Sequence, residues 1–208
     1  MTTTKAYKGL PMEGLIATWY AKTTLKDVKR HRLMAKQLAE KIPANGKVLE
    51  IAPGPGYFSI ELAKLDKYEI TGLDISKSFV EIARKNAEQA GLRIDFREGN
   101  ASAMPFKDNT FDFTFCQAAF KNFSEPVKAI AEMYRVLRPG GQLFGADFVE
   151  PRSSFGKAIR PLTRRFERVA DNLDGFLPVM FREAGFKNYM ETRRYFFGSI
   201  SLFQGSKS

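Results

Sequence analysis

Hydrophobic residues recur along this chain in two patterns. Short apolar runs are rich in branched and aromatic side chains, and longer stretches place apolar residues three or four positions apart. The short runs predict buried parallel strands, and the longer spacing predicts amphipathic helices. We expect strands near residues 48–51, 68–73, 93–101, 109–116 and 142–149. We expect helices at 76–89 and 125–137, the second ended by the turn Pro139-Gly140-Gly141.

Three segments lie outside this series of strands and helices: the two ends of the chain and residues 151–174. An amphipathic helix is expected within residues 12–42, and its apolar side carries Val28, Leu33, Leu38 and Ile42. Residues 151–174 mix apolar residues with arginine and lysine at helical spacing, and Pro161 predicts a kink there. The end of the chain predicts a helix at 178–186 and an antiparallel hairpin over 187–204 with a turn near Phe197-Gly198.

Strands that alternate with helices along the chain in this way predict one three-layer α/β domain over residues 1–208. A chain of 208 residues is long enough to bury a single core. Within the domain we expect an N-terminal helical lid at 1–44, a cofactor-binding core at 45–150 and an inserted helical cap at 151–174. A C-terminal helix and hairpin would complete it at 175–208.

A glycine turn follows the first expected strand. Gly54 and Gly56 let the backbone approach a ligand closely at the carboxyl end of that strand, and Pro55 between them stiffens the turn. The helix that starts near Tyr57 directs free N–H groups into the same crevice. This arrangement predicts a binding site for a ligand with an anionic group.

The second strand ends in Asp74, a position where a carboxylate can accept hydrogen bonds from both hydroxyls of a ribose. Together with the glycine turn, this residue predicts a nucleoside pocket. The alternative is that Asp74 only caps the helix at 76–89. Ser76 and Ser78 are better candidates for that cap, Ser78 in a capping box with Glu81.

These two motifs, with residues 100–106, Phe111-Asp112 and residues 135–141, resemble the class I S-adenosylmethionine-dependent methyltransferases over about two thirds of the chain. The resemblance implies a Rossmann-like, doubly wound sheet of seven strands, mostly parallel, with an antiparallel C-terminal hairpin. It implies S-adenosylmethionine as cofactor and S-adenosylhomocysteine as product. It also places Glu50 on the methionine ammonium. The residues expected at the cofactor are Glu50, Ala52, Gly54, Gly56, Asp74, Ile75, Asn100, Ala101 and Gln117.

The chain departs from the family pattern at two of these positions. Ala52 stands where the family has the first glycine of its turn, which predicts a negative φ at that residue. Asn100 stands where an aspartate usually meets the adenine amino group, and its amide can both accept and donate. The alternative for Asn100 is a plain turn residue after Gly99. A dinucleotide enzyme is a competing interpretation, but the third glycine of its phosphate-binding motif is missing.

Substrate contacts are expected outside the common core. Trp19 and Tyr20 either cover the cofactor cleft or anchor their helix to the sheet. We expect Phe120 and Phe155 to join them around the substrate. Tyr20, Gln117, Lys121 and Asn122 are candidates for positioning it, and none is an evident general base. The single histidine, His31, is either a base or a solvent-exposed residue of the N-terminal helix, so no catalytic residue is assigned.

Composition and net charge limit the classes of partner that this chain is expected to bind. The net charge of +10 either attracts an anionic partner or belongs to solvated faces. The basic residues are dispersed, and no nucleic-acid-binding or metal-binding motif accompanies them. We therefore expect neither a nucleic-acid partner nor a bound metal. No apolar run approaches the ~20 residues that span a bilayer, and no signal peptide is evident. We therefore expect no membrane partner and a cytoplasmic location, while the oligomeric state stays open. Cys116, the only cysteine, is interpreted as a small buried hydrophobe.

The sequence thus predicts a methyltransferase that moves a methyl group to a small molecule by direct in-line displacement. Such a reaction needs an aligned nucleophile in a dry, preorganised pocket. The open alternatives are an RNA or protein methyltransferase and a non-catalytic S-adenosylmethionine-binding protein.

Overall fold

The computed structural model describes residues 12–65, 68–148, 176–194 and 200–208. The helical elements are α1 (Gly14–Thr24), the 3₁₀ turn η1 (Leu25–Asp27), α2 (Val28–Ala39), α3 (Tyr57–Ala63), α4 (Lys77–Gln89), the 3₁₀ turn η2 (Phe120–Asn122), α5 (Pro126–Val136) and α7 (Phe176–Glu183). The strands are β1 (Lys47–Ile51), β2 (Glu69–Asp74), β3 (Asp95–Glu98), β4 (Phe111–Gln117), β5 (Leu137–Phe148), β6 (Lys187–Arg194) and β7 (Ile200–Ser206).

The strands form one seven-stranded sheet in the order β3-β2-β1-β4-β5-β7-β6. The first five strands are parallel to one another, and β7 runs antiparallel between β5 and β6. This is the doubly wound sheet with an antiparallel C-terminal hairpin that the sequence predicted, so that prediction is confirmed. The turn expected near Phe197-Gly198, the segment 151–174 with Pro161, and Phe155 lie outside the described residues.

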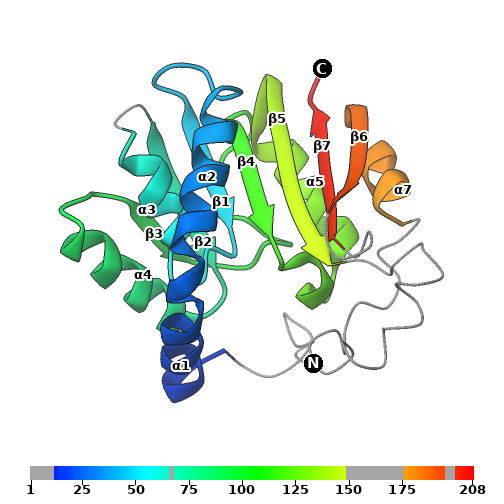
Figure 1. Cartoon of the computed structure of the whole chain (residues 1–208). Coiled ribbons are helices and arrows are strands. Elements are labelled where there is room, and N and C mark those ends of the chain that lie inside the picture. The colour runs from blue at the N-terminus through cyan, green and yellow to red at the C-terminus, as the bar shows by residue number, and fades with distance from the viewer. Residues whose placement is uncertain (1–11, 66–67, 149–175, 195–199) are drawn as a thin grey trace.

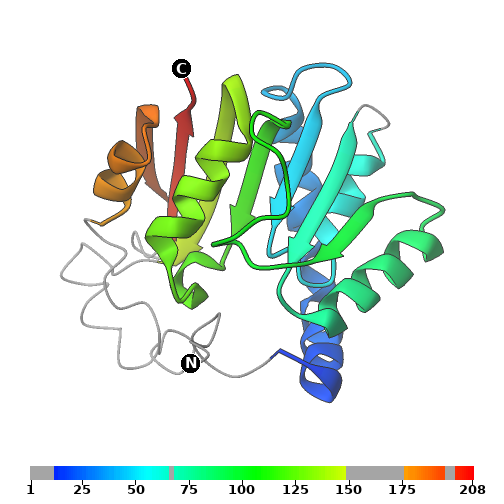
Figure 2. The same ribbon diagram turned by 180° about the vertical axis from the view of Figure 1, so that it is seen from behind.

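Helices cover both faces of the sheet, as Figures 1 and 2 show from opposite sides. On one face α5 and α7 bury aliphatic and aromatic residues against β1, β4 and β5, including Ile130, Met133 and Phe181. On the other face α2 and α3 cover β1 and β4 through Leu38, Phe58 and Phe115, and α4 packs beside α3 on Phe96. The core therefore has two apolar layers, one on each side of the parallel strands.

The carboxyl ends of the parallel strands meet at one edge of the sheet, the lower edge in Figure 1. The helix α1 lies at that same end of the molecule. In an open α/β sheet, ligands bind in the crevice outside these carboxyl ends. The topology thus brings the glycine turn, Asp74 and the end of β4 to one edge.

Two details of the secondary structure differ from the sequence prediction. The helix α5 ends at Val136, before the Pro-Gly-Gly turn, and Leu137 is already extended and pairs with Phe111. The next pair joins Gln142 to Phe113, so the turn forms an irregularity within β5. The residue that precedes a proline, Arg138, is biased toward extended backbone, which accounts for the early end of the helix.

The N-terminal helix is also not a single element, because η1 separates α1 from α2. Leu38 and Ile42 are buried as predicted, but the placement of Leu33 on the apolar side was wrong, since it is 64% exposed. The buried face of α2 is set by Ala35 and Leu38, and Ile42 is buried just after the helix ends. Leu33 precedes Ala35 by only two residues, so it lies on the opposite side of the helix.

Candidate functional site

The turn after β1 contains three residues in the left-handed region, Ala52 (φ 56°), Gly54 (φ 53°) and Gly56 (φ 77°). The prediction of a negative φ at Ala52 was therefore wrong. The turn imposes this conformation because the Ala52 N–H still donates to the Leu73 carbonyl of β2 at 2.8 Å while the chain reverses into α3. An alanine in this region costs ~1–2 kcal/mol relative to its ordinary backbone conformations.

The two glycines of the turn have different roles. A Cβ on Gly54 would meet no atom within 4 Å, so the space beside its backbone is open to a ligand. A Cβ on Gly56 would lie 2.8 Å from the ring of Phe96 and 3.0 Å from the Cβ of Ala83. Gly56 therefore permits close packing of the turn against β3 and α4, whereas Gly54 permits close approach of a ligand.

Asp74, the last residue of β2, lies directly against this turn. Its buried carboxylate accepts hydrogen bonds from the Gly54 N–H and the Ser76 N–H, both at 2.9 Å. Ile75, the next residue, is half-buried. Ser76 is the N-cap of α4, and its hydroxyl accepts from the Phe79 N–H at 3.0 Å. The helix cap and the carboxylate are thus separate groups, and Asp74 stays available at the strand end.

Glu50 is the second buried carboxylate, one strand away on β1. It accepts hydrogen bonds from the Ser59 N–H at 3.1 Å and from the Ser59 hydroxyl. Burial raises the pKa of Glu50 to about 7, and the Asp74 charge acts in the same direction. Burial likewise raises the pKa of Asp74 to about 6. Two buried acids beside an open glycine backbone form a site suited to a ligand that brings positive charge and hydrogen-bond donors.

The loop between β3 and β4 carries the two residues expected at an adenine ring. Asn100 is half-buried, and its amide oxygen accepts from the Ser102 N–H at 2.8 Å. That contact is a local turn of the kind that the alternative interpretation describes. Ala101, beside it, is buried.

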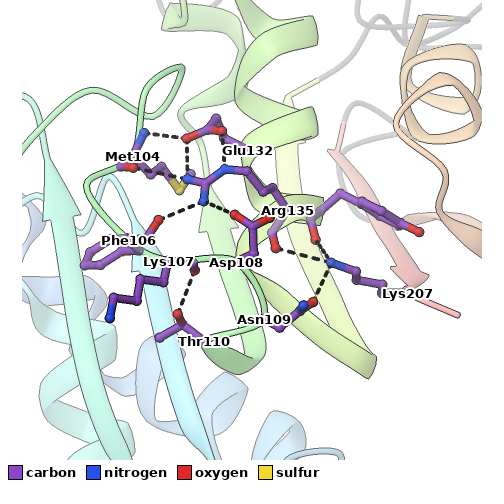
Figure 3. A network of polar contacts seen from close by, with 10 residues as sticks. Met104, Phe106, Lys107, Asp108, Asn109, Thr110, Glu132, Arg135 and Lys207 are labelled. Atoms are coloured by element: carbon purple, nitrogen blue, oxygen red, sulfur yellow. Dashed lines mark hydrogen bonds and ion pairs between the residues drawn. The ribbon is translucent and has the colours of Figure 1, made fainter.

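This loop is fastened to α5 by the network of polar contacts in Figure 3. The Arg135 guanidinium donates to the Glu132 and Asp108 carboxylates and to the carbonyls of Met104 and Phe106, at 2.6–3.2 Å. Glu132 also accepts from the Met104 N–H at 2.6 Å. Lys207, near the end of the chain, adds contacts to Asn109 and to the carbonyls of Tyr134 and Arg135. The network fixes the loop that carries Asn100.

The start of the described chain is attached to the N-terminus of α4 by three hydrogen bonds. The Ser76 hydroxyl donates to the Met12 carbonyl at 2.6 Å, and the Gly14 N–H donates to the Ser78 hydroxyl at 2.9 Å. The Ser78 N–H donates to the Glu13 carboxylate at 3.0 Å. Ser78 therefore binds the incoming segment and is not the cap that the capping-box prediction made it.

The helix α1 bridges the N-termini of α3 and α4. The Tyr57 hydroxyl of α3 donates to the Ala21 carbonyl at 2.8 Å, and the ring of Tyr20 packs edge-on against Phe79 of α4 at 5.7 Å. Burial raises the pKa of Tyr20, and the Asp74 charge adds to that effect. Tyr20 thus lies near the site, whereas Trp19 is 66% exposed.

The segment after β4 holds the remaining substrate candidates. Gln117, Lys121 and Asn122 are half-buried, Gln117 as the last residue of β4 and the others in η2. Phe120 is buried in the core against Phe123 and Phe203, with ring centroids 5.3 and 5.2 Å away. That packing favours a structural role for Phe120 over contact with a substrate.

The structure also shows the environment of residues outside these groups. His31 is half-buried beside the Tyr57 ring, so the solvent-exposed interpretation was wrong, and burial lowers its pKa. Cys116 is buried, as predicted, and burial raises the pKa of its thiol. Sequence reasoning passed over Ser59 and Asp147, both buried. The signal for Asp147 was a lone acid near the carboxyl end of an apolar strand.

Two observations bear on ligands and membranes. Within the described ranges, no group of three or more histidine, cysteine, aspartate or glutamate side chains could hold a metal ion. In the same part of the chain, no helix is long and apolar enough to cross a membrane.

Comparisons with known proteins agree with this architecture. A family model described as a methyltransferase domain matches residues 49–145. A demethylmenaquinone methyltransferase of Thermus thermophilus is 37% identical over 155 residues, which cover 73% of this chain and 68% of the relative. A ubiquinone/menaquinone biosynthesis C-methyltransferase of Roseobacter denitrificans is 31% identical over 184 residues, which cover 76% and 74%.

A solved structure from Methanococcus maripaludis has a TM-score of 0.79 at 22% identity, and the match covers 97% of this chain and 96% of that one. At this identity the likeness shows the shared fold. The two sequence relatives carry the family assignment, because each is more than 30% identical and is covered over more than two thirds of its length. The chain therefore belongs to the class I S-adenosylmethionine-dependent methyltransferase family, and it is an enzyme that methylates a small molecule with S-adenosylmethionine as the methyl donor.

Proposed function

We propose that this enzyme methylates a ring carbon of a reduced quinone, a quinol that carries a prenyl side chain. The support for this acceptor is the pair of relatives named for demethylmenaquinone and for ubiquinone/menaquinone C-methylation, which match most of the chain. A quinol ring is electron-rich and can act as the carbon nucleophile without a strong base. That property fits a site in which none of the positioning candidates is an evident base at neutral pH.

We further propose that Glu50 and Asp74 hold the cofactor. The observation that carries this assignment is the pair of buried acids at neighbouring strand ends, beside the open backbone of Gly54. A buried carboxylate is stabilised by a cation or by donors that replace lost water. S-adenosylmethionine offers an ammonium, a sulfonium and two ribose hydroxyls, so its chemistry matches this set of acceptors. The donors that Asp74 now uses are backbone N–H groups, which leaves lone pairs for hydroxyls.

The bound cofactor would supply the methyl group: a bond would form between that carbon and the ring carbon as the carbon–sulfur bond breaks, with S-adenosylhomocysteine as the leaving group. The proton that the ring carbon then loses would be released to solvent. The residues of the chain orient the partners and exclude water. The bridge that α1 makes between α3 and α4 brings Tyr20 to the edge of the site. Gln117, at the end of β4, is a candidate to hold a quinol hydroxyl. A dry, preorganised pocket favours a step in which the charge on sulfur disappears.

The direct test incubates the purified enzyme with labelled S-adenosylmethionine and a chemically reduced, short-chain prenyl naphthoquinol. Transfer of label to a ring carbon, located by nuclear magnetic resonance, is the expected result. Asp74→Asn is the matched control, because it retains an acceptor at the strand end but removes the charge. Label on a ring oxygen would rule out the proposed acceptor. The same conclusion would follow if the enzyme binds the cofactor but labels no quinol. The assignment of the cofactor residues would survive that outcome.

A further inference from the structure

Large apolar side chains lie exposed on the outer side of α1. Leu15 is 88% exposed, Trp19 66% and Ile16 44%, while Ala17 and Ala21 of the same helix are buried. Leu15 and Trp19 are four residues apart, so they lie on one side of the helix, next to each other. Single exposed apolar residues are ordinary, but a cluster on one helix marks a contact surface.

Positive charge continues the same side of this helix. Lys22, near the end of α1, comes three residues after Trp19, and Lys26, in the η1 turn that follows, comes four residues after Lys22; both are exposed. The nearby acids are engaged elsewhere, since Glu13 accepts from the Ser78 N–H and Asp27 pairs with Arg30 at 3.9 Å. Within the described part of the chain, neither lysine has an ion-pair partner. We call Leu15, Trp19, Lys22 and Lys26 the outer α1 face.

The outer α1 face adjoins the site. The helix lies at the end of the molecule where the parallel strands end, as Figure 1 shows. Its other side bridges α3 and α4 through Ala21 and Tyr20. A surface that binds the outer α1 face would therefore lie at the same end of the molecule as the carboxyl ends of the parallel strands.

The chemistry of this face selects its partner. Tryptophan is favoured at the boundary between a bilayer and water, and lysine is attracted to an anionic headgroup surface. A negatively charged lipid surface complements Lys22 and Lys26, whereas a second copy packed face to face would bring the same lysines together. The absence of a spanning run, from which we expected no membrane partner, does not exclude a contact of this kind.

We propose that the outer α1 face docks the enzyme on an anionic phospholipid bilayer, so that the site opens toward the headgroups. This proposal rests on the proposed quinol acceptor for its purpose, because a prenyl chain keeps such a quinol in the bilayer. The docking itself is independent of the acceptor and is measured without it.

The first measurement uses vesicles of phosphatidylcholine alone and vesicles that also contain phosphatidylglycerol. Trp19 is the only tryptophan, so its emission reports the face directly. The expected result is a blue shift and co-flotation with the anionic vesicles only. The Lys22→Ala/Lys26→Ala variant should bind these vesicles at least about tenfold more weakly, given the attraction of each lysine to an anionic surface. Leu15→Ser should also weaken binding.

The matched control is Lys36→Ala/Lys41→Ala, which removes the same charge from exposed positions on and just after α2. Its binding should change by less than about threefold. Equal loss in both double variants would overturn the proposal, because the attraction would then follow net charge alone. Loss confined to an Arg164→Ala/Arg165→Ala/Arg168→Ala variant would overturn it too, by placing the contact elsewhere.

Two further outcomes are decisive. Self-association without lipid that Leu15→Ser abolishes would make the face an interface between copies and refute the lipid assignment. Kinetics separate this proposal from the proposed function: the lysine variant should raise KM for a prenyl quinol in vesicles and leave turnover of a soluble, unprenylated quinol unchanged. Docking with no quinol methylated would refute the acceptor only, and quinol methylation without docking would refute the docking only.

Discussion

Replacing Glu50 with glutamine is expected to stabilise the cofactor-free protein at alkaline pH while it weakens cofactor binding. The wild-type carboxyl is buried, and burial raises its pKa from an ordinary 4.5 to about 7. The folded protein therefore holds a proton that the unfolded chain releases between these values. Stability that depends on this proton is present at low pH and is lost as pH rises toward and through 7. Glutamine has no charge to bury, so the stability of the Glu50→Gln variant does not show this loss as pH rises.

The magnitude follows from 1.36 kcal/mol per pH unit. A carboxyl with these two pKa values costs the folded state ~1 kcal/mol at pH 5 and ~3 kcal/mol at pH 8. The loss or distortion of a Ser59 hydrogen bond in Glu50→Gln adds a penalty that is the same at both pH values. The advantage of the variant should therefore grow by ~2 kcal/mol from pH 5 to pH 8. For a chain of this size that is a widening of the Tm difference by about 4–8 °C.

Thermal and urea unfolding of both proteins at pH 5, 6, 7 and 8 measure this growth. Glu61→Gln is the matched control, a second buried glutamate, on α3. Burial alone would raise the pKa of Glu61, but its bonds to Arg32 and Lys64 outweigh that effect and lower it. The control should lose stability at neutral pH, opposite in sign to Glu50→Gln. A difference between Glu50→Gln and wild type that is constant with pH would refute the reasoning.

Three further predictions concern the turn, the ribose carboxylate and the loop anchor. Ala52→Gly should stabilise the protein by ~0.5–1 kcal/mol, because the relief of backbone strain at φ 56° exceeds the entropy that glycine gains in the unfolded chain. The control Ala63→Gly, in α3, should cost ~1 kcal/mol. Equal losses of stability in urea unfolding of the two variants would contradict this prediction. Asp74→Asn should weaken S-adenosylhomocysteine binding by ~1.5–3 kcal/mol in calorimetry, and an unchanged affinity in the folded variant would remove Asp74 from the site. Arg135→Ala should lower the unfolding free energy by ~2 kcal/mol, since Glu132 and two carbonyls lose their donor; a loss below ~0.5 kcal/mol would show that the network does not anchor the loop.

The sequence by itself determined the class of fold and the location of the cofactor turn. Periodicity, together with the length of each apolar run and its branched and aromatic residues, distinguishes short buried strands from amphipathic helices, and the order of strands and helices permits few topologies. The spacing of Gly54 and Gly56 after one strand, with Asp74 ending the next, is local information that survives without coordinates. The same holds for the antiparallel hairpin formed by β6 and β7, because its two strands are adjacent in sequence.

Only the tertiary structure decided the state of individual groups. Ala52 has a positive φ, against the local preference of alanine, in a turn whose N–H is bonded to Leu73 on a neighbouring strand. The raised pKa of Glu50 comes from burial under α3, and the lowered pKa of Glu61 comes from partners, one of them 29 residues away in sequence. Trp19 is exposed because Ala17 and Ala21 take the inner side of α1. Conformation, charge and exposure at these positions depend on contacts between distant residues, and only the folded chain supplies them.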